Sequence, residues 1–168
     1  WQRVPAFLVL GVLLISLVYT STLSSNPKFI VTADRGEKAL RSADTYQKTA
    51  TDILNGSILN KSKLTIDSGK ISQQLMEAFP DLQEVELALP LMGRRPILKA
   101  IPERPAILLA SKNGVFVVGA SGKVLAKTSE VQGSESLSIP SVRDDTNLTI
   151  TPGKGVLSEQ DVTFITTL

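Results

Sequence analysis

The sequence predicts an α+β protein: a single N-terminal transmembrane helix, a β-α-α-β-β domain, and then an incomplete antiparallel β-rich domain. Three observations lead to this fold class. The chain begins with an uncharged apolar run, two later segments carry apolar residues at helical spacing, and the remainder alternates apolar and polar residues in short runs. The expected boundaries are 1–3 for a cytoplasmic remnant, 4–23 for the transmembrane helix, 24–102 for a tether and the first domain, and 103–168 for the second domain, expected to be truncated.

The apolar run extends from Val4 to Pro27 without a charged residue. Residues 4–23 would form about 30 Å of helix, which matches the hydrocarbon core of a bilayer. Trp1 and Tyr19 occupy positions typical of interfacial aromatic residues. Two alternatives stay open: a cleaved signal peptide, for which the apolar core is long, and a helix buried in the protein core. An uncleaved membrane anchor is the interpretation that the pattern favours.

Two helices are expected in the first domain, over Ser42–Asn55 and Ser68–Phe79. Asp67 can cap the second helix, because its carboxylate can accept from the free N–H groups of the first turn. Apolar residues spaced three and four apart give each helix one apolar face: Tyr46, Ala50, Ile53 and Leu54 in the first, and Ile71, Leu75 and Phe79 in the second. Each helix therefore has a face that can pack on a sheet.

Strands are expected before and after these helices. Lys28–Ala33 is a β-branched run, and in Glu84–Leu89 the apolar residues Val85, Leu87 and Leu89 occur at every second position, which indicates a strand with one buried face. Further short apolar runs are separated by turn residues: Ile97–Ile101, Ala106–Ala110, Val115–Val118 and Lys123–Ala126. The tail adds a run at Asn147–Thr151 and the start of a helix at Ser158–Val162.

Composition excludes several kinds of chemistry. The chain has no cysteine and no histidine, which removes disulfides, thiolate catalysis and the commonest general base. The formal net charge is only +2, and the sequence has no basic stripe of the kind that binds nucleic acid. The carboxylates lack the spacing of a metal loop or of an acid/base pair. We expect no enzyme activity, cofactor, metal, nucleic acid or small-molecule substrate.

Several motifs, in order along the chain, resemble one known family. The β-α-α-β-β order after a single apolar helix resembles a POTRA domain. Phe79–Val85 resembles the "P-x-I-x-x-V" motif that leads into the penultimate strand of this domain in FtsQ/DivIB proteins. Four later stretches continue the match: Pro96–Ala106, Asn113–Gly122, Ile139-Pro140 and Leu157–Val162. Together they resemble an FtsQ/DivIB-type bacterial cell division protein, which has a POTRA domain followed by a β-domain.

The resemblance implies a non-enzymatic divisome scaffold. Such a protein binds other single-span division proteins, FtsB/DivIC-like and FtsL-like, outside the membrane and helps couple division to septal peptidoglycan synthesis. It would be a single-pass protein of the bacterial cell membrane at the division septum, with a cytoplasmic N-terminus and extracytoplasmic domains. This orientation rests on the resemblance, since basic residues are more frequent after the apolar run than before it. The alternatives are an anchored POTRA-like envelope adaptor in protein secretion or assembly, and an anchored cell-wall enzyme.

Five residues are candidates for interaction or for shaping the corner between the domains. Arg94 and Arg95 lie on an expected turn, where they could meet anionic lipid or a partner's acid, or simply be solvated. Glu103 and Arg104 could form a partner-facing ion pair, or hold the corner together with Pro105. The strand after Pro96, and any exposed strand of the β-region, could also pair with an extended segment of a partner.

Overall fold

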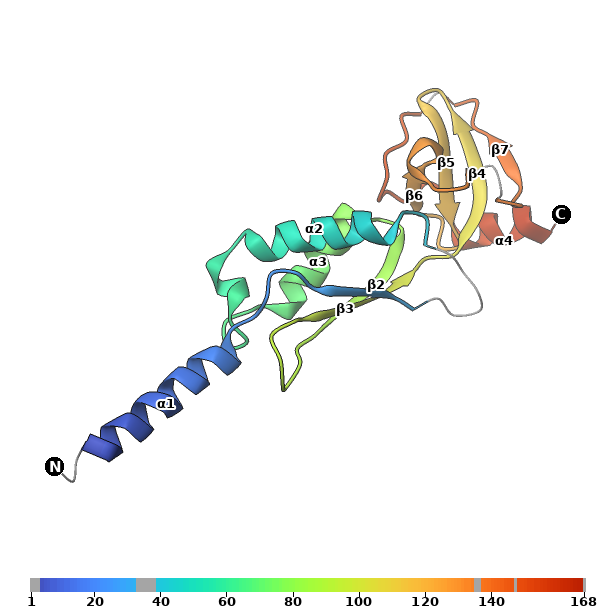
Figure 1. Ribbon diagram of the computed structural model, residues 1–168. Coiled ribbons are helices and arrows are strands. Elements are labelled where there is room, and N and C mark those ends of the chain that lie inside the picture. The colour runs from blue at the N-terminus through green and yellow to red at the C-terminus, as the bar shows by residue number, and fades with distance from the viewer. Residues whose placement is uncertain (1–3, 33–38, 135–136, 147, 168) are drawn as a thin grey trace.

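A computed structural model describes residues 4–32, 39–134, 137–146 and 148–167 of the chain. An N-terminal helix, α1, projects away from two α+β units that follow one another, and the chain ends lie at opposite ends of the molecule (Figure 1). Each unit is built on its own sheet, of three strands in the first unit and four in the second. The chain is therefore α+β and contains two separate sheets.

Helix α1 (Val4–Ser21) corrects the prediction of a transmembrane helix over residues 4–23. Its side chains are described from Leu8 on, and the large apolar ones are exposed, Ile15 by 71%. At 1.5 Å per residue, the 18 residues of the helix are about 27 Å long. Within the described ranges, no helix has the length and apolar character needed to cross a membrane. The finding conflicts with the predicted single-pass location in the cell membrane.

The first unit contains the predicted order of elements. They are β1 (Lys28–Val31), α2 (Ala43–Asn55), a 3-10 turn (Ile58–Lys61), α3 (Ser68–Ala78), β2 (Leu82–Ala88) and β3 (Ile97–Pro102). The sheet order is β1-β3-β2, in which β3 pairs in parallel with β1 and antiparallel with β2. Helices α2 and α3 lie side by side along this sheet (Figure 1). Strand β3, which comes last along the chain in this unit, therefore lies in the centre of the sheet.

Local signals explain both helices of this unit. Ser42 caps α2 by accepting from the backbone N–H of Thr45. Asp67 caps α3, as predicted, by accepting from the backbone N–H of Lys70. The apolar faces pack on the buried side of the sheet, and their buried residues form one core: Tyr46, Ala50, Leu54, Ile71, Leu75, Phe79, Leu82, Val85, Leu87, Leu98 and Ala100. The alternation predicted for β2 is confirmed, because Val85 and Leu87 are buried whereas Glu86 is exposed.

The second unit is a mixed sheet, not the antiparallel one that the sequence predicts. Its elements are β4 (Pro105–Ser111), β5 (Gly114–Gly119), β6 (Val124–Lys127), a 3-10 turn (Thr128–Glu130), β7 (Ser141–Arg143) and α4 (Glu159–Thr167). The order is β6-β5-β4-β7, and β7 runs parallel to β4. After β6 the chain returns to the opposite edge of the sheet, so that its next strand runs in the direction of β4. Residues 148–151 form no strand, and residue 147 lies outside the described residues.

The four-stranded sheet buries apolar residues on both faces. One face packs Ile107, Leu109, Phe116, Val118 and Val124 with Ile150 and Ile165. The other packs Val117, Leu125, Ala126 and Val131 with Leu40, which precedes α2. The second core thus includes a residue from the first unit's part of the chain, so the boundary predicted at residue 103 does not separate the two cores.

Candidate functional site

A cluster of polar side chains connects the two units. Asp81, which is fully buried, lies just before β2 and accepts from the Arg41 guanidinium through Oδ1 and from the Tyr46 hydroxyl through Oδ2. The second terminal nitrogen of Arg41 donates to Glu130 Oε2 of the second unit at 2.8 Å. The Arg41 guanidinium also lies 5.5 Å from the Phe79 ring centroid. We call these four polar residues, Arg41, Tyr46, Asp81 and Glu130, the junction cluster.

Burial sets the electrostatics of the junction cluster. Loss of solvent raises the pKa of Asp81 above its usual value, although the Tyr46 hydroxyl and the Arg41 guanidinium oppose this by stabilising the carboxylate. Burial, and then the neighbouring carboxylate, raises the pKa of the Tyr46 hydroxyl. Each carboxylate oxygen of Asp81 already has a donor. Asp81 thus holds Arg41 and Tyr46 in place within the first unit, and Arg41 extends the cluster to Glu130 of the second unit.

Glu103 lies at the corner between β3 and β4, next to the junction cluster. It is 7% exposed, and its backbone N–H donates to the carbonyl of Asp81 at 2.8 Å. Its Oε1 accepts from the backbone N–H of Ser121 at 3.3 Å and from the Ser121 hydroxyl, while Lys123 Nζ lies 3.0 Å from Oε2. A β-carbon on Gly119 would collide with this carboxylate. Glu103 therefore faces inward at this corner.

The other two corner candidates contribute mainly through their backbone. Arg104 is exposed, and its carbonyl accepts from the backbone N–H of Ala120 at 3.1 Å. Pro105 is half-buried and pairs with Gly119 at the start of the β4–β5 ladder. Glu103 forms its ion pair with Lys123, and within the described ranges no ion pair joins Glu103 to Arg104.

Arg94 and Arg95 occupy the turn between β2 and β3, as predicted, and both are exposed. The structure gives both an intramolecular role as well. Arg95 donates to the carbonyls of Asn26 at 3.2 Å and Pro27 at 3.3 Å, and the Arg94 guanidinium lies 5.0 Å from the Tyr19 ring centroid. These two arginines therefore hold the end of α1 and the segment before β1 against the β2–β3 turn.

The corner also brings a serine and a lysine together, a pair that can act as nucleophile and base in some hydrolases. The Ser121 hydroxyl and the Lys123 amine both contact Glu103, one on each carboxylate oxygen. The hollow that Lys123 lines is formed with residues of α3 and of the 152–154 segment, and Ser121 does not line it. The geometry thus directs both groups to the Glu103 carboxylate instead of to each other.

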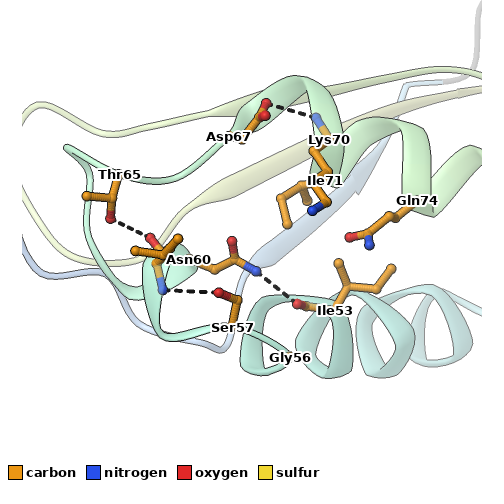
Figure 2. A pocket seen from close by; sticks show the side chains of 10 residues that line it. Ile53, Gly56, Ser57, Asn60, Thr65, Asp67, Lys70, Ile71 and Gln74 are labelled. Atoms are coloured by element: carbon orange, nitrogen blue, oxygen red, sulfur yellow. Dashed lines mark hydrogen bonds between the residues drawn. The ribbon is translucent and has the colours of Figure 1, made fainter.

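A hollow of about 490 Å³ lies between the end of α2, the following 3-10 turn and the start of α3. Figure 2 shows that several of its polar groups bond to neighbouring residues of the same wall. Asn60 Nδ2 donates to the carbonyl of Ile53 at 3.1 Å, and Thr65 Oγ1 donates to that of Leu59 at 2.7 Å. Asp67 caps α3 from the same wall. These contacts stabilise the connection between the two helices.

The sheet edges decide where a partner strand could be added. The strand after Pro96 cannot accept one, because β3 has β1 on one side and β2 on the other. The predicted use of that strand is therefore wrong. Strand β2 is the seven-residue edge of its sheet, and among the described strands it pairs with β3 alone. On the second sheet, β6 is partly covered by residues 153–155, and β7 is a three-residue edge.

The fold and these sites define a class: a two-unit α+β protein whose buried polar residues join the units and whose first sheet has an open edge. Comparison with models of known protein families and with curated protein sequences finds no match.

Proposed function

We propose that this chain is a non-catalytic scaffold that binds a protein partner as an added strand along β2. The observation that carries the proposal is the edge position of β2, which has seven residues and pairs on one side only. An edge strand offers main-chain donors and acceptors to another extended chain. The junction cluster favours this use, because it holds β2 in a fixed place relative to the second unit through Asp81, which directly precedes the strand.

The partner class follows from the family resemblance. The ordered motifs from Phe79 to Val162 resemble FtsQ/DivIB-type proteins, whose partners are FtsB/DivIC-like and FtsL-like division proteins. We accordingly propose a role in cell division in which the chain binds these proteins and helps couple division to septal peptidoglycan synthesis.

Amide hydrogen exchange tests the strand addition directly. The purified chain is mixed with FtsB/DivIC-like and FtsL-like proteins, and exchange is followed for the backbone amides of residues 83–88. The proposal expects some of these amides to become protected in the complex, since an added strand accepts from the N–H groups on the open edge. Binding with no new protection in β2 would overturn the strand-addition proposal.

A charge reversal on β2 provides a matched pair of variants. The Glu86 side chain is 63% exposed beside the edge, whereas Glu77 is exposed on α3. Because neighbouring strands place side chains next to each other, Glu86→Lys should change the affinity for the partner, and Glu77→Lys should leave it unchanged. Equal effects of the two substitutions would contradict binding along β2.

Depletion of the protein in growing cells tests the division role separately. The proposal expects a division defect that the wild-type chain corrects and that Glu86→Lys corrects poorly. Normal division after depletion would overturn the division role, while the exchange experiment would still decide on strand addition.

A further inference from the structure

Three segments that are distant in sequence meet where α1 ends. The backbone N–H of Leu23 donates to the carbonyl of Lys61 at 2.8 Å, and that of Ser24 donates to the carbonyl of Arg94 at 2.6 Å. Lys63 Nζ donates to the carbonyl of Leu91 at 3.4 Å, which joins the α2–α3 connection to the β2–β3 turn. In Figure 1 the β2–β3 turn extends toward the side of the first unit from which α1 leaves. The two loops therefore form one end of the folded unit.

Large apolar side chains are exposed on both loops. The β2–β3 turn carries Leu91, 97% exposed, and Met92, 94% exposed, and the α2–α3 connection carries Ile58, 82% exposed, and Leu64, 83% exposed. We call these four residues the apolar tips. They stand out from two neighbouring loops. Large exposed apolar side chains gathered at one place mark an interaction surface.

Basic residues predominate around the apolar tips. Lys61, Lys63, Arg94 and Arg95 lie on the same two loops, and the carboxylate there belongs to Asp67, which caps α3. Arg94 contacts Tyr19 of α1 and Arg95 contacts Asn26, and these contacts hold both cations beside the tips. Apolar side chains surrounded by cations fit a surface that is apolar inside and negatively charged outside.

We propose that the apolar tips dock on an anionic lipid surface, with the four basic residues contacting the headgroups. Protruding side chains enter a fluid interface readily, whereas a protein partner would need a matching hollow for each tip. Lysine and arginine side chains near an anionic leaflet add electrostatic attraction to the apolar contact. The tips reach the headgroup region of one leaflet, so this docking requires no segment that crosses the bilayer.

A local probe of the tips is available because the chain has no cysteine. The full chain with Met92→Cys is labelled with an environment-sensitive dye and mixed with vesicles of phosphatidylcholine alone or of phosphatidylcholine with phosphatidylglycerol. The dye emission should shift to the blue with the anionic vesicles and much less with the neutral ones. The control carries the dye at Lys112→Cys, on the exposed β4–β5 turn of the second unit, and should not shift.

Charge variants separate this contact from any binding by α1, which is identical in all of them. In the labelled Met92→Cys chain, Lys61→Gln, at an exposed side chain, should weaken binding to anionic vesicles about fivefold. Lys112→Gln serves as the matched control and should have no effect. Raising the salt concentration should weaken the binding of the parent chain as well.

Three results would overturn the proposal. The dye at residue 92 could stay in water with every vesicle. Its shift could be the same on neutral and anionic vesicles and insensitive to Lys61→Gln. It could also respond to an acidic polypeptide such as polyglutamate while ignoring vesicles, which would indicate a protein partner instead.

Discussion

The junction cluster and the apolar tips both depart from the usual distribution of side chains. The junction buries a charged residue, and the tips expose apolar ones. At the junction, the charged side chain of Asp81 is fully buried, and each of its oxygens has a donor. At the tips, Leu91 and Met92 are almost fully exposed. A buried charge with its partners is held in place by the fold, and an exposed apolar side chain contributes little to the fold. The comparison indicates that the junction maintains the structure and that the tips serve something outside the chain.

The largest effect should come from Arg41→Met, which leaves Asp81 buried without its cation. Removing one partner of a buried ion pair costs about 3–5 kcal/mol of unfolding free energy. Urea unfolding of the full chain measures the loss, and Arg143→Met, on the exposed edge strand β7, is the control. Adding Asp81→Asn to Arg41→Met should recover part of the loss, because the unpaired charge is then gone. A loss below about 1 kcal/mol would show that the Arg41–Asp81 pair contributes no more than an ordinary surface ion pair.

The pH dependence of stability sharpens the same point. Burial raises the pKa of Asp81 in the folded state, so the folded chain holds the proton at this site more tightly than the unfolded chain does. Stability from this group is fully present below the unfolded pKa of about 4 and is lost as the pH rises toward the higher folded value. The stability of the wild type relative to Asp81→Asn should therefore fall through this window. Urea unfolding measures this difference, and a relative stability that rises with pH would contradict the prediction.

Gly119→Ala tests the corner beside the junction. Its new methyl group would collide with the Glu103 carboxylate, which Ser121 and Lys123 hold in place, and overpacking of this kind costs about 1–3 kcal/mol. The matched control is Gly155→Ala, since a β-carbon there meets nothing within 4 Å. Thermal unfolding of both variants should show a lower melting temperature for Gly119→Ala than for Gly155→Ala. Similar melting temperatures would mean that Glu103 can move aside.

Glu130→Gln should have a smaller effect than either change, although it removes a contact between the units. The Glu130 side chain is 51% exposed, so solvent screens its attraction to Arg41, and such pairs contribute about 0–1 kcal/mol. Urea unfolding at low and high salt measures the difference, which should shrink as salt increases. A loss of stability that is large and independent of salt would show that Glu130, like Asp81, is part of a pair that solvent does not screen.

The smallest effect on stability should come from Leu91→Ser combined with Met92→Ser. Both side chains are almost fully exposed, and surface substitutions of this kind change unfolding free energy by about 0.5 kcal/mol or less. The same variant should bind anionic vesicles more weakly in a sedimentation assay. A clear loss of stability would show that the tips pack against the chain and would remove the contrast with the junction.

Elements with local signals could be predicted from the sequence. Helix α3 has its cap at Asp67 and its apolar spacing within a few residues, and both are found in the structure. The alternation in β2 is equally local. The parallel pairings of β1 with β3 and of β7 with β4 could not be derived in this way, because strand pairing is made by backbone groups that carry no residue signature.

The junction cluster was also missed, and the reason is again distance along the chain. Arg41 and Asp81 are separated by 40 positions, and each resembles an ordinary exposed residue in its local window. One signal was present: Asp81 lies between Phe79-Pro80 and Leu82, at the start of a strand with a buried face. Of the site candidates, Arg94 and Arg95 were placed on the correct turn, but their contacts with α1 and with the segment before β1 required the folded chain.

The parallel pairing of β1 with β3 has a mechanical consequence. Lys28 lies opposite Ile97 and Val31 opposite Ala100, so the two strands run in the same direction. Tension applied between α1 and the second unit pulls β1 from its N-terminal end and β3 from its C-terminal end. The load then acts along the strands in shear, so that the hydrogen bonds between them share it and must break together. The first sheet can therefore transmit force between the two ends of the molecule without opening one bond at a time.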